Sequence, residues 1–187
     1  MNILVIDQIA KRAETLEQAL VKLGHNVMVR PPGKYAIYQM VESFQPDVVI
    51  VDADSPDRDT LEDVSVTSDR CPRPIIFFAN DEDDEVIRQS IQAGVSAYIV
   101  DGLQPNRVKS LLNVAISRFE QHQQLKGELK KTRDELADRK VIDKAKGLLM
   151  KHKVCDEEAA FAAMRKMAMN KNVRLAEIAQ DVIDLFG

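Results

Sequence analysis

Two aspartates that follow short apolar runs are the residues of the front half that could do chemistry. Asp7 comes directly after the apolar run at 3–6, and Asp52 comes directly after the run at 48–51. Each run predicts a buried strand of a parallel sheet, and the carboxyl ends of such strands meet at one edge. Convergent carboxylates there can hold a divalent cation, and one of them can accept a phosphoryl group. The sequence therefore predicts an acidic pocket with Mg²⁺ as its candidate ligand.

The second chemical signal is positive and lies in the rear of the chain. Residues 139–174 contain 10 basic and 4 acidic residues, for a net charge of +6. Lys140, Lys144, Gly147 and Lys151 are spaced i, i+4, i+7 and i+11, which places them on one stripe of a helix. Three ammonium groups around a glycine would let a phosphate backbone come close. The alternatives are a solvated face for the lysines and close helix packing for the glycine.

A second basic group follows on the next predicted helix, where Arg165, Met169 and Asn172 share one side. A guanidinium can stack on an unpaired base or bind it with two hydrogen bonds, and asparagine and lysine reach base edges and phosphates. Loop bases of RNA are the expected targets, because the deep groove of an RNA stem is closed to side chains. The alternative is that Arg165 and Lys166 are exposed neighbours of a methionine core. The residues predicted to bind RNA are Lys140, Lys144, Lys146, Gly147, Lys151, Arg165, Lys166, Met169, Lys171, Asn172 and Arg174.

Five apolar runs that alternate with helical patterns must position the acidic pocket. They fall within residues 1–110, which carry 11 basic and 18 acidic residues. This alternation predicts an α/β domain with a doubly wound, five-stranded parallel sheet of the flavodoxin-like order. The polar stretch 57–69 is ambiguous between a short helix and a loop.

One long helix is predicted from about Pro105 to Lys153, followed by two shorter amphipathic helices. Residues 111–138 would form a coiled-coil linker, and residues 139–187 a small all-α domain of three helices. Asp156 is the expected N-cap of the second helix, and the methionines are expected to fill the core. A single surface helix is the alternative to a dimer seam, because half of the heptad positions are polar or small. The seam residues would be Leu111, Ala115, Leu125, Leu129 and Leu136.

Composition excludes several classes of protein. Aromatic residues make up 5% of the 187 residues and tryptophan is absent, which disfavours an aromatic platform for single-stranded nucleic acid. No apolar run could span a bilayer, and the N-terminus lacks the pattern of a signal peptide. Cys71 and Cys155 form no disulfide or metal motif and fit a reducing cytoplasm. Neither a phosphate-binding glycine loop nor a nucleophile motif is present, so we expect no enzyme and no cofactor.

The front half resembles a response-regulator receiver domain over residues 1–110. Asp7 matches an acid of the metal pair, Asp52 the phosphoacceptor, and Asp54 the position whose carbonyl reaches the metal. Pro56 and the stretch 92–98 match further positions of that domain. The resemblance implies an acidic pocket of Asp7, Asp52 and Asp54.

Three departures from the receiver pattern argue against phosphorylation. Gln8 stands where the second acid is expected, Ala79 where the hydroxyl residue is expected, and Asp101 where the lysine that pairs with the phosphate is expected. A carboxylate in place of that ammonium reverses the sign of the interaction with a phosphoryl group. The sequence therefore predicts a pseudo-receiver in which neither phosphorylation of Asp52 nor a metal at Asp7 and Asp52 is expected.

The rear half resembles an ANTAR domain, an RNA-binding antiterminator module, over residues 139–185. The matching elements are Ala145-Lys146-Gly147-Leu148-Leu149-Met150, Asp156-Glu157-Glu158-Ala159-Ala160, Met164-Arg165-Lys166-Met167-Ala168-Met169 and Arg174-Leu175-Ala176-Glu177-Ile178-Ala179. The resemblance implies a homodimer that binds hairpins of leader RNA so that transcription passes a terminator. The whole chain is most similar to NasT-type regulators of nitrate and nitrite assimilation, which implies a NasS-type sensor protein as inhibitor.

Two other functions remain open at this level. A basic, all-helical tail also suits a DNA-binding response regulator, although the last predicted helix, 175–186, contains no lysine or arginine. A phosphorelay component with a tail that only dimerises would require phosphorylation of Asp52.

Overall fold

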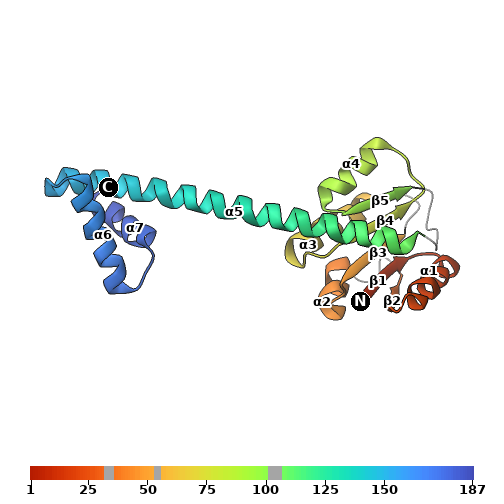
Figure 1. Ribbon diagram of the computed structural model, residues 1–187. Helices are drawn as coiled ribbons and strands as arrows, with labels where there is room; N and C mark the ends of the chain where they lie inside the picture. Colours follow the sequence, from red (N-terminus) through yellow and green to blue (C-terminus); the bar gives the residue numbers. More distant parts are fainter. Residues whose placement is uncertain (32–35, 53–55, 101–106) are drawn as a thin grey trace. The chain divides into compact units, whose positions relative to one another are not determined.

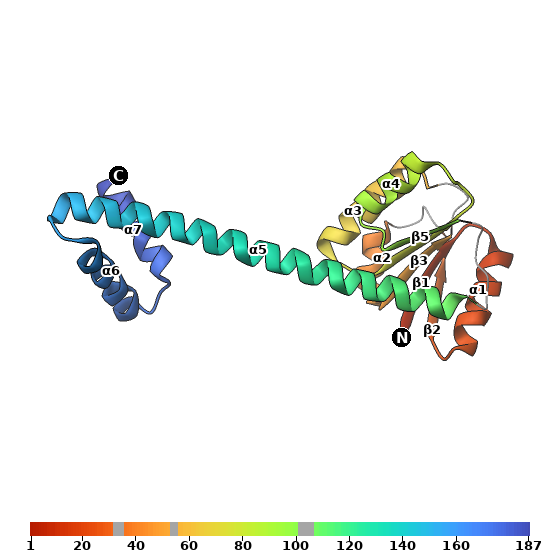
Figure 2. The ribbon, with the colours of Figure 1, turned by 45° about the horizontal axis from the view of Figure 1, so that its top comes forward.

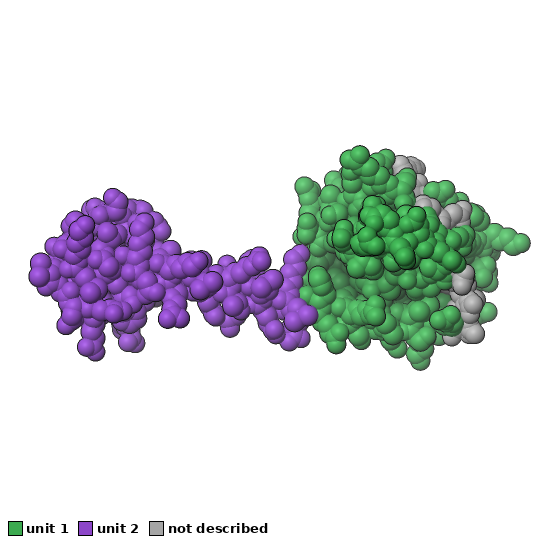
Figure 3. Space-filling model, turned by 90° about the horizontal axis from the view of Figure 1, so that it is seen from above, with its two compact units in different colours: residues 1–123 green, residues 124–187 purple. Residues whose placement is uncertain are grey.

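The computed structural model describes residues 1–31, 36–52, 56–100 and 107–187 (Figure 1). These residues form two compact units, 1–123 and 124–187, each described here by itself (Figure 3). In the described ranges, no helix is both long and apolar enough to cross a membrane.

The front unit is built on the predicted parallel sheet. Its strands are β1 Asn2–Asp7, β2 Asn26–Arg30, β3 Val48–Asp52, β4 Ile75–Ala79 and β5 Ala97–Val100. They lie in the order β2-β1-β3-β4-β5, and every neighbouring pair is parallel. The expectation of a doubly wound, five-stranded sheet is confirmed.

Helices cover both faces of this sheet, because side chains alternate along each strand. The helices are α1 Ala10–Lys22, α2 Ile37–Phe44, α3 Arg58–Arg70, α4 Asp84–Ala93 and the first turns of α5 Val108–Lys153. Ile3 and Val5 face a core shared with α1 and α5, whereas Leu4 and Ile6 face a core shared with α2 and α3. Figure 2 shows α2, α3 and α4 on the other side of the sheet from α1 and α5.

The ambiguous polar stretch forms the helix α3. Asp57 caps it, since its side chain accepts a hydrogen bond from the backbone N–H of Thr60. The helix buries only Val64 and Thr67 against the sheet, which is too little apolar surface for a clear periodic pattern.

Helix α5 corrects part of the predicted dimer seam. Ala115 is fully buried in the core of the front unit and Leu111 packs against that core, so neither is available to a second chain. Leu125, Leu129 and Leu136 are 65%, 53% and 54% exposed. The heptad spacing therefore runs from the core of the front unit into an exposed stretch of α5. Of the five predicted seam residues, only Leu125, Leu129 and Leu136 could contact a second chain.

The rear unit packs the end of α5 against α6 Glu157–Lys171 and α7 Leu175–Phe186. Its core holds Leu149, Met164 and Ile178. Asp156 is the N-cap of α6, as expected, and accepts a hydrogen bond from the N–H of Ala159 at 2.7 Å. The remaining buried core residues are Ala145, Ala160, Ala168, Ala179 and Val182.

Only one of the α6 methionines fills this core. Met164 is fully buried, whereas Met167 is 38% and Met169 73% exposed. Residues spaced by four form a narrow stripe that faces α5 and α7, and the other two methionines lie off that stripe.

Candidate acidic pocket and nucleic-acid interface

The predicted acidic pocket lies at the ends of β1 and β3. Asp7 and Asp52 are register partners across these strands. Both residues are 4% exposed. Two buried carboxylates that face one another need a compensating positive charge.

Arg12, on the first turn of α1, supplies that charge. Its Nε donates to Asp7 Oδ2 and its Nη2 donates to Asp7 Oδ1, both at 3.1 Å. Nε also lies 3.1 Å from Asp52 Oδ2, and Nη2 donates to the Asp52 carbonyl at 3.4 Å. The guanidinium therefore bridges the ends of β1 and β3.

Sequence reasoning missed Arg12, although a signal was present. The first turn of α1 contains no acidic residue and instead carries Lys11 and Arg12. Acidic residues are favoured at a helix N-terminus, because the helix dipole is positive there. A basic pair at this position, just after a strand-end aspartate, indicates a local anionic partner.

The structure describes only part of the remaining receiver pattern. Asp54 of the predicted pocket, and Asp101, lie outside the described residues. Ala79 is the last residue of β4 and is 3% exposed, so no hydroxyl group stands there. Within the described ranges, no group of three or more His, Cys, Asp or Glu side chains could hold a metal ion.

The lysine stripe of α5 is open to solvent. Lys140, Lys144 and Lys151 are exposed, and in the described part of the chain no carboxylate pairs with any of them. With Gly147 they fall within an arc of about 60° around the helix. A Cβ atom on Gly147 would meet nothing within 4 Å. Packing among the described residues therefore does not explain this glycine.

Lys146 differs from the stripe, because two carboxylates hold it. Its Nζ lies 2.7 Å from Asp143 Oδ1 and 2.6 Å from Glu157 Oε1, and the side chain is 17% exposed. The hydrogen bonds to Asp143 and Glu157 raise the pKa of Lys146, and the bond from Lys146 lowers the pKa of Asp143. This lysine joins the end of α5 to the start of α6.

Two further predicted RNA-binding cations are also paired. Arg174 contacts Glu177 at 2.9 Å and Asp138 at 3.9 Å. Lys171 lies 3.4 Å from Asp181. These contacts join the cations beside the turn between α6 and α7 to carboxylates of α5 and α7.

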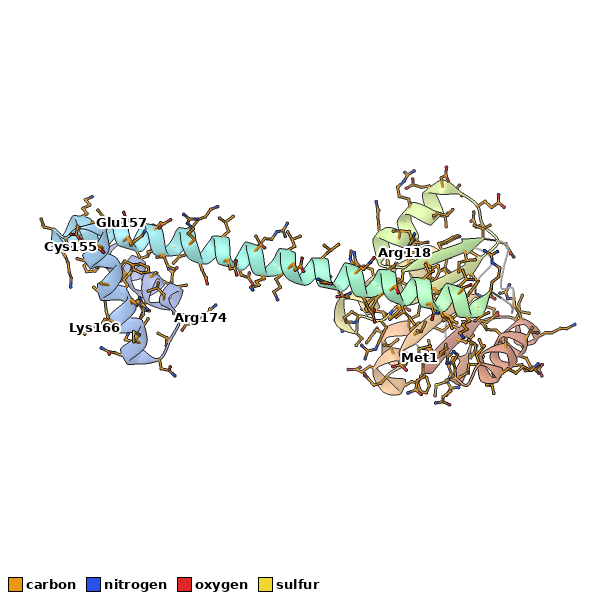
Figure 4. All side chains as sticks on the ribbon, in the orientation of Figure 1. Met1, Arg118, Cys155, Glu157, Lys166 and Arg174 are labelled. Carbon is orange, nitrogen blue, oxygen red and sulfur yellow. The ribbon has the colours of Figure 1, made fainter. Side chains whose placement is uncertain are left out.

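The outer side of α6 holds the other unpaired cations. Arg165 and Lys166 are exposed, and among the described residues neither pairs with a carboxylate. Figure 4 shows Lys166 on the side of α6 away from α7. Met169 is 73% exposed beside them. Asn172 ends the helix in the left-handed conformation, with φ 53°, a role that favours asparagine or glycine.

Comparisons with known proteins find a family match within the rear unit. Residues 130–183 match the ANTAR domain. The chain is 25% identical over 180 residues to the transcriptional regulatory protein PdtaR of Mycobacterium tuberculosis (strain CDC 1551 / Oshkosh), covering 91% of this chain and 88% of that protein. It is 44% identical over 75 residues to the nitrate regulatory protein of Klebsiella oxytoca, covering 40% of this chain and 19% of that protein.

A solved structure shows the same fold in the front unit. The BeF3-activated N-terminal receiver domain of RstA from Klebsiella pneumoniae has a TM-score of 0.55 and 20% identity, covering 62% of this chain and 98% of that domain. The chain thus joins a receiver-like fold to an ANTAR domain, as the sequence predicts. Its relatives are named as regulators, which favours a regulatory protein over an enzyme.

Proposed function

We propose that the chain is an RNA-binding transcription antiterminator that binds hairpins in leader RNA. One observation carries the proposal: Lys140, Lys144 and Lys151 are exposed around the open surface of Gly147, and no carboxylate among the described residues pairs with them. The ANTAR match over 130–183 supports it. A DNA-reading helix is less well supported, because α7 contains no lysine or arginine.

The exposed cations of α5 and α6 would bind different parts of the RNA. The lysines of α5 would neutralise phosphates of the RNA backbone, and the open glycine would let that backbone approach the helix. Arg165, on α6, would stack on a loop base or bind its edge, with Lys166 beside it. Lys146, Lys171 and Arg174 would act mainly by fixing the helices, because carboxylates already hold them.

The dimer, the target genes and the inhibitory partner are proposals as well. A homodimer would form through Leu125, Leu129 and Leu136, which are large, apolar and exposed. The target genes would serve nitrate and nitrite assimilation, and a NasS-type sensor protein in the cytoplasm would hold the chain inactive. A pull-down with such a sensor should recover the chain without nitrate and release it when nitrate is added. No association under either condition would refute control by this partner.

A salt-titrated gel shift tests RNA binding. The probes are a two-hairpin leader RNA, a loop-scrambled copy and duplex DNA. The wild type should prefer the intact hairpins and lose affinity steeply between about 50 and 200 mM salt. The double variant Arg165→Ala/Lys166→Ala should lose discrimination between intact and scrambled loops.

The matched control is Lys130→Ala/Lys131→Ala, which removes two adjacent, exposed positive charges of α5 outside the stripe. It should keep loop discrimination. Equal binding of all three probes by the wild type would refute the proposal, and a preference for duplex DNA would favour a DNA-binding regulator.

A further inference from the structure

The acidic pocket of the front unit has its positive charge built into the chain. The Asp7 and Asp52 side chains are 0% and 3% exposed, and the Arg12 side chain is 27% exposed. We propose that the Arg12 guanidinium is the resident cation of this pocket, in place of a divalent metal. Removing it should create a metal site that the native chain lacks.

Arg12 engages several oxygens of the pocket at once. It contacts both carboxylate oxygens of Asp7, and also Oδ2 and the carbonyl of Asp52. A planar fork that meets a carboxylate with two parallel N–H groups forms one of the strongest charge-assisted contacts in proteins. The backbone N–H of Ile9 adds a hydrogen bond to Asp7 Oδ1 at 2.7 Å.

The Arg12 guanidinium also occupies the space beside the carboxylate oxygens that a metal would need. Mg²⁺ binds oxygen ligands at about 2.0–2.1 Å and keeps an octahedral shell. Arg12 Nε lies 3.1 Å from Asp7 Oδ2 and 3.1 Å from Asp52 Oδ2, so it already engages one oxygen of each carboxylate that could ligate a divalent cation. Metal and guanidinium would therefore compete for the same oxygens.

Arg12 belongs to a helix that the core holds in place. Ala13 and Leu16, the next core residues of α1, are 3% and 0% exposed. The core therefore holds the start of α1 beside the ends of β1 and β3. A metal could bind these carboxylates only if the Arg12 side chain left the pocket, and its contacts with Asp7 and Asp52 oppose that movement.

Titration of the full chain with Mn²⁺, followed by electron paramagnetic resonance, tests the proposal. The wild type should show no saturable site up to about 10 mM, whereas carboxylate-rich sites commonly saturate below that. Arg12→Gln should gain one site, at least about tenfold tighter, because two buried carboxylates then lack their cation. Lys11→Gln is the matched control, since it removes one exposed charge from the same helical turn, and it should behave as the wild type.

Stability in Mg²⁺ provides a second readout that holds even where Arg12→Gln unfolds. All three tyrosines, at 35, 38 and 98, lie in the front unit, so tyrosine fluorescence follows that unit alone. Millimolar Mg²⁺ should restore folded signal to Arg12→Gln and leave Lys11→Gln unchanged. A wild-type Mn²⁺ site that Asp7→Asn abolishes would overturn the proposal. So would an Arg12→Gln variant that neither binds Mn²⁺ more tightly than the control nor is rescued by Mg²⁺.

Discussion

Replacing Gly147 with alanine should separate the stability of the rear unit from its affinity for RNA. Glycine in a helix interior is about 0.8–1.0 kcal/mol less favourable than alanine. The added Cβ would meet nothing within 4 Å, so no steric cost reduces this gain. We expect the unit to gain about 0.8 kcal/mol, a rise of roughly 3–6 °C in Tm for a unit of this size.

RNA affinity should change in the opposite direction. A methyl group inserted into a close contact costs about 1 kcal/mol or more, which corresponds to a loss of about five- to tenfold in Kd. The assays are thermal unfolding by circular dichroism and the hairpin gel shift, carried out on the same preparations.

Gly127→Ala is the matched control, because Gly127 also lies within α5 and a Cβ there would meet nothing within 4 Å. It should stabilise the helix and leave RNA binding unchanged. Unchanged RNA affinity in Gly147→Ala would refute a close approach of RNA at this glycine. A loss of stability in Gly147→Ala alone would show that the surface around it is not open.

Three further predictions concern the two units. Arg12→Gln should lower the free energy of unfolding of the front unit by about 2–3 kcal/mol, because it removes the Arg12 cation from two buried carboxylates. Urea unfolding followed by tyrosine fluorescence would measure this loss, and a loss below about 0.5 kcal/mol would contradict the prediction. Gly94→Ala should lower the free energy of unfolding of the front unit by about 2 kcal/mol or more, because φ at Gly94 is 108° and the added Cβ would clash with Ser68. An unchanged thermal unfolding curve would refute this prediction. The hydrogen bond from Lys146 lowers the pKa of Asp143, so the rear unit should lose the stabilisation from this pair as the pH falls below about 4. Asp143→Asn should weaken the loss of stability in acid. An identical dependence of stability on pH in the wild type and the variant would contradict this prediction.

The sheet could be predicted because its strands are buried on both faces. Runs such as 48–51 are continuous and apolar, and the helices between them carry clear stop signals. Helix α3 lacked such a signal, because Val64 and Thr67 are the two residues it buries.

The contents of the acidic pocket could be predicted only in part. Asp7 and Asp52 end neighbouring parallel strands, so the strand order of the doubly wound sheet is enough to predict that they lie side by side. Arg12 reaches Asp52 across 40 residues of sequence, so the contact depends on how α1 packs on the sheet.

In the rear unit, too, the sequence predicts the arrangement of charges only in part. Spacing groups the lysines of α5 correctly on one stripe, but it cannot tell which cations are paired. Lys146 meets Glu157, which is 11 residues away across the turn into α6. Similarly, the heptad pattern treats Ala115 and Leu125 alike, although one lies in a core and the other is 65% exposed.

In the proposed dimer, a seam formed by the three exposed leucines of α5 would make association sensitive to the number and spacing of the RNA hairpins. A seam with few apolar positions gives a weak dimer that dissociates on dilution. A leader RNA with two hairpins would bind one chain at each, and the tether would raise the effective concentration of the second chain into the millimolar range. The seam would then close on such an RNA and stay open on a single hairpin. Its weakness would thereby allow the chain to select leaders by the spacing of their hairpins.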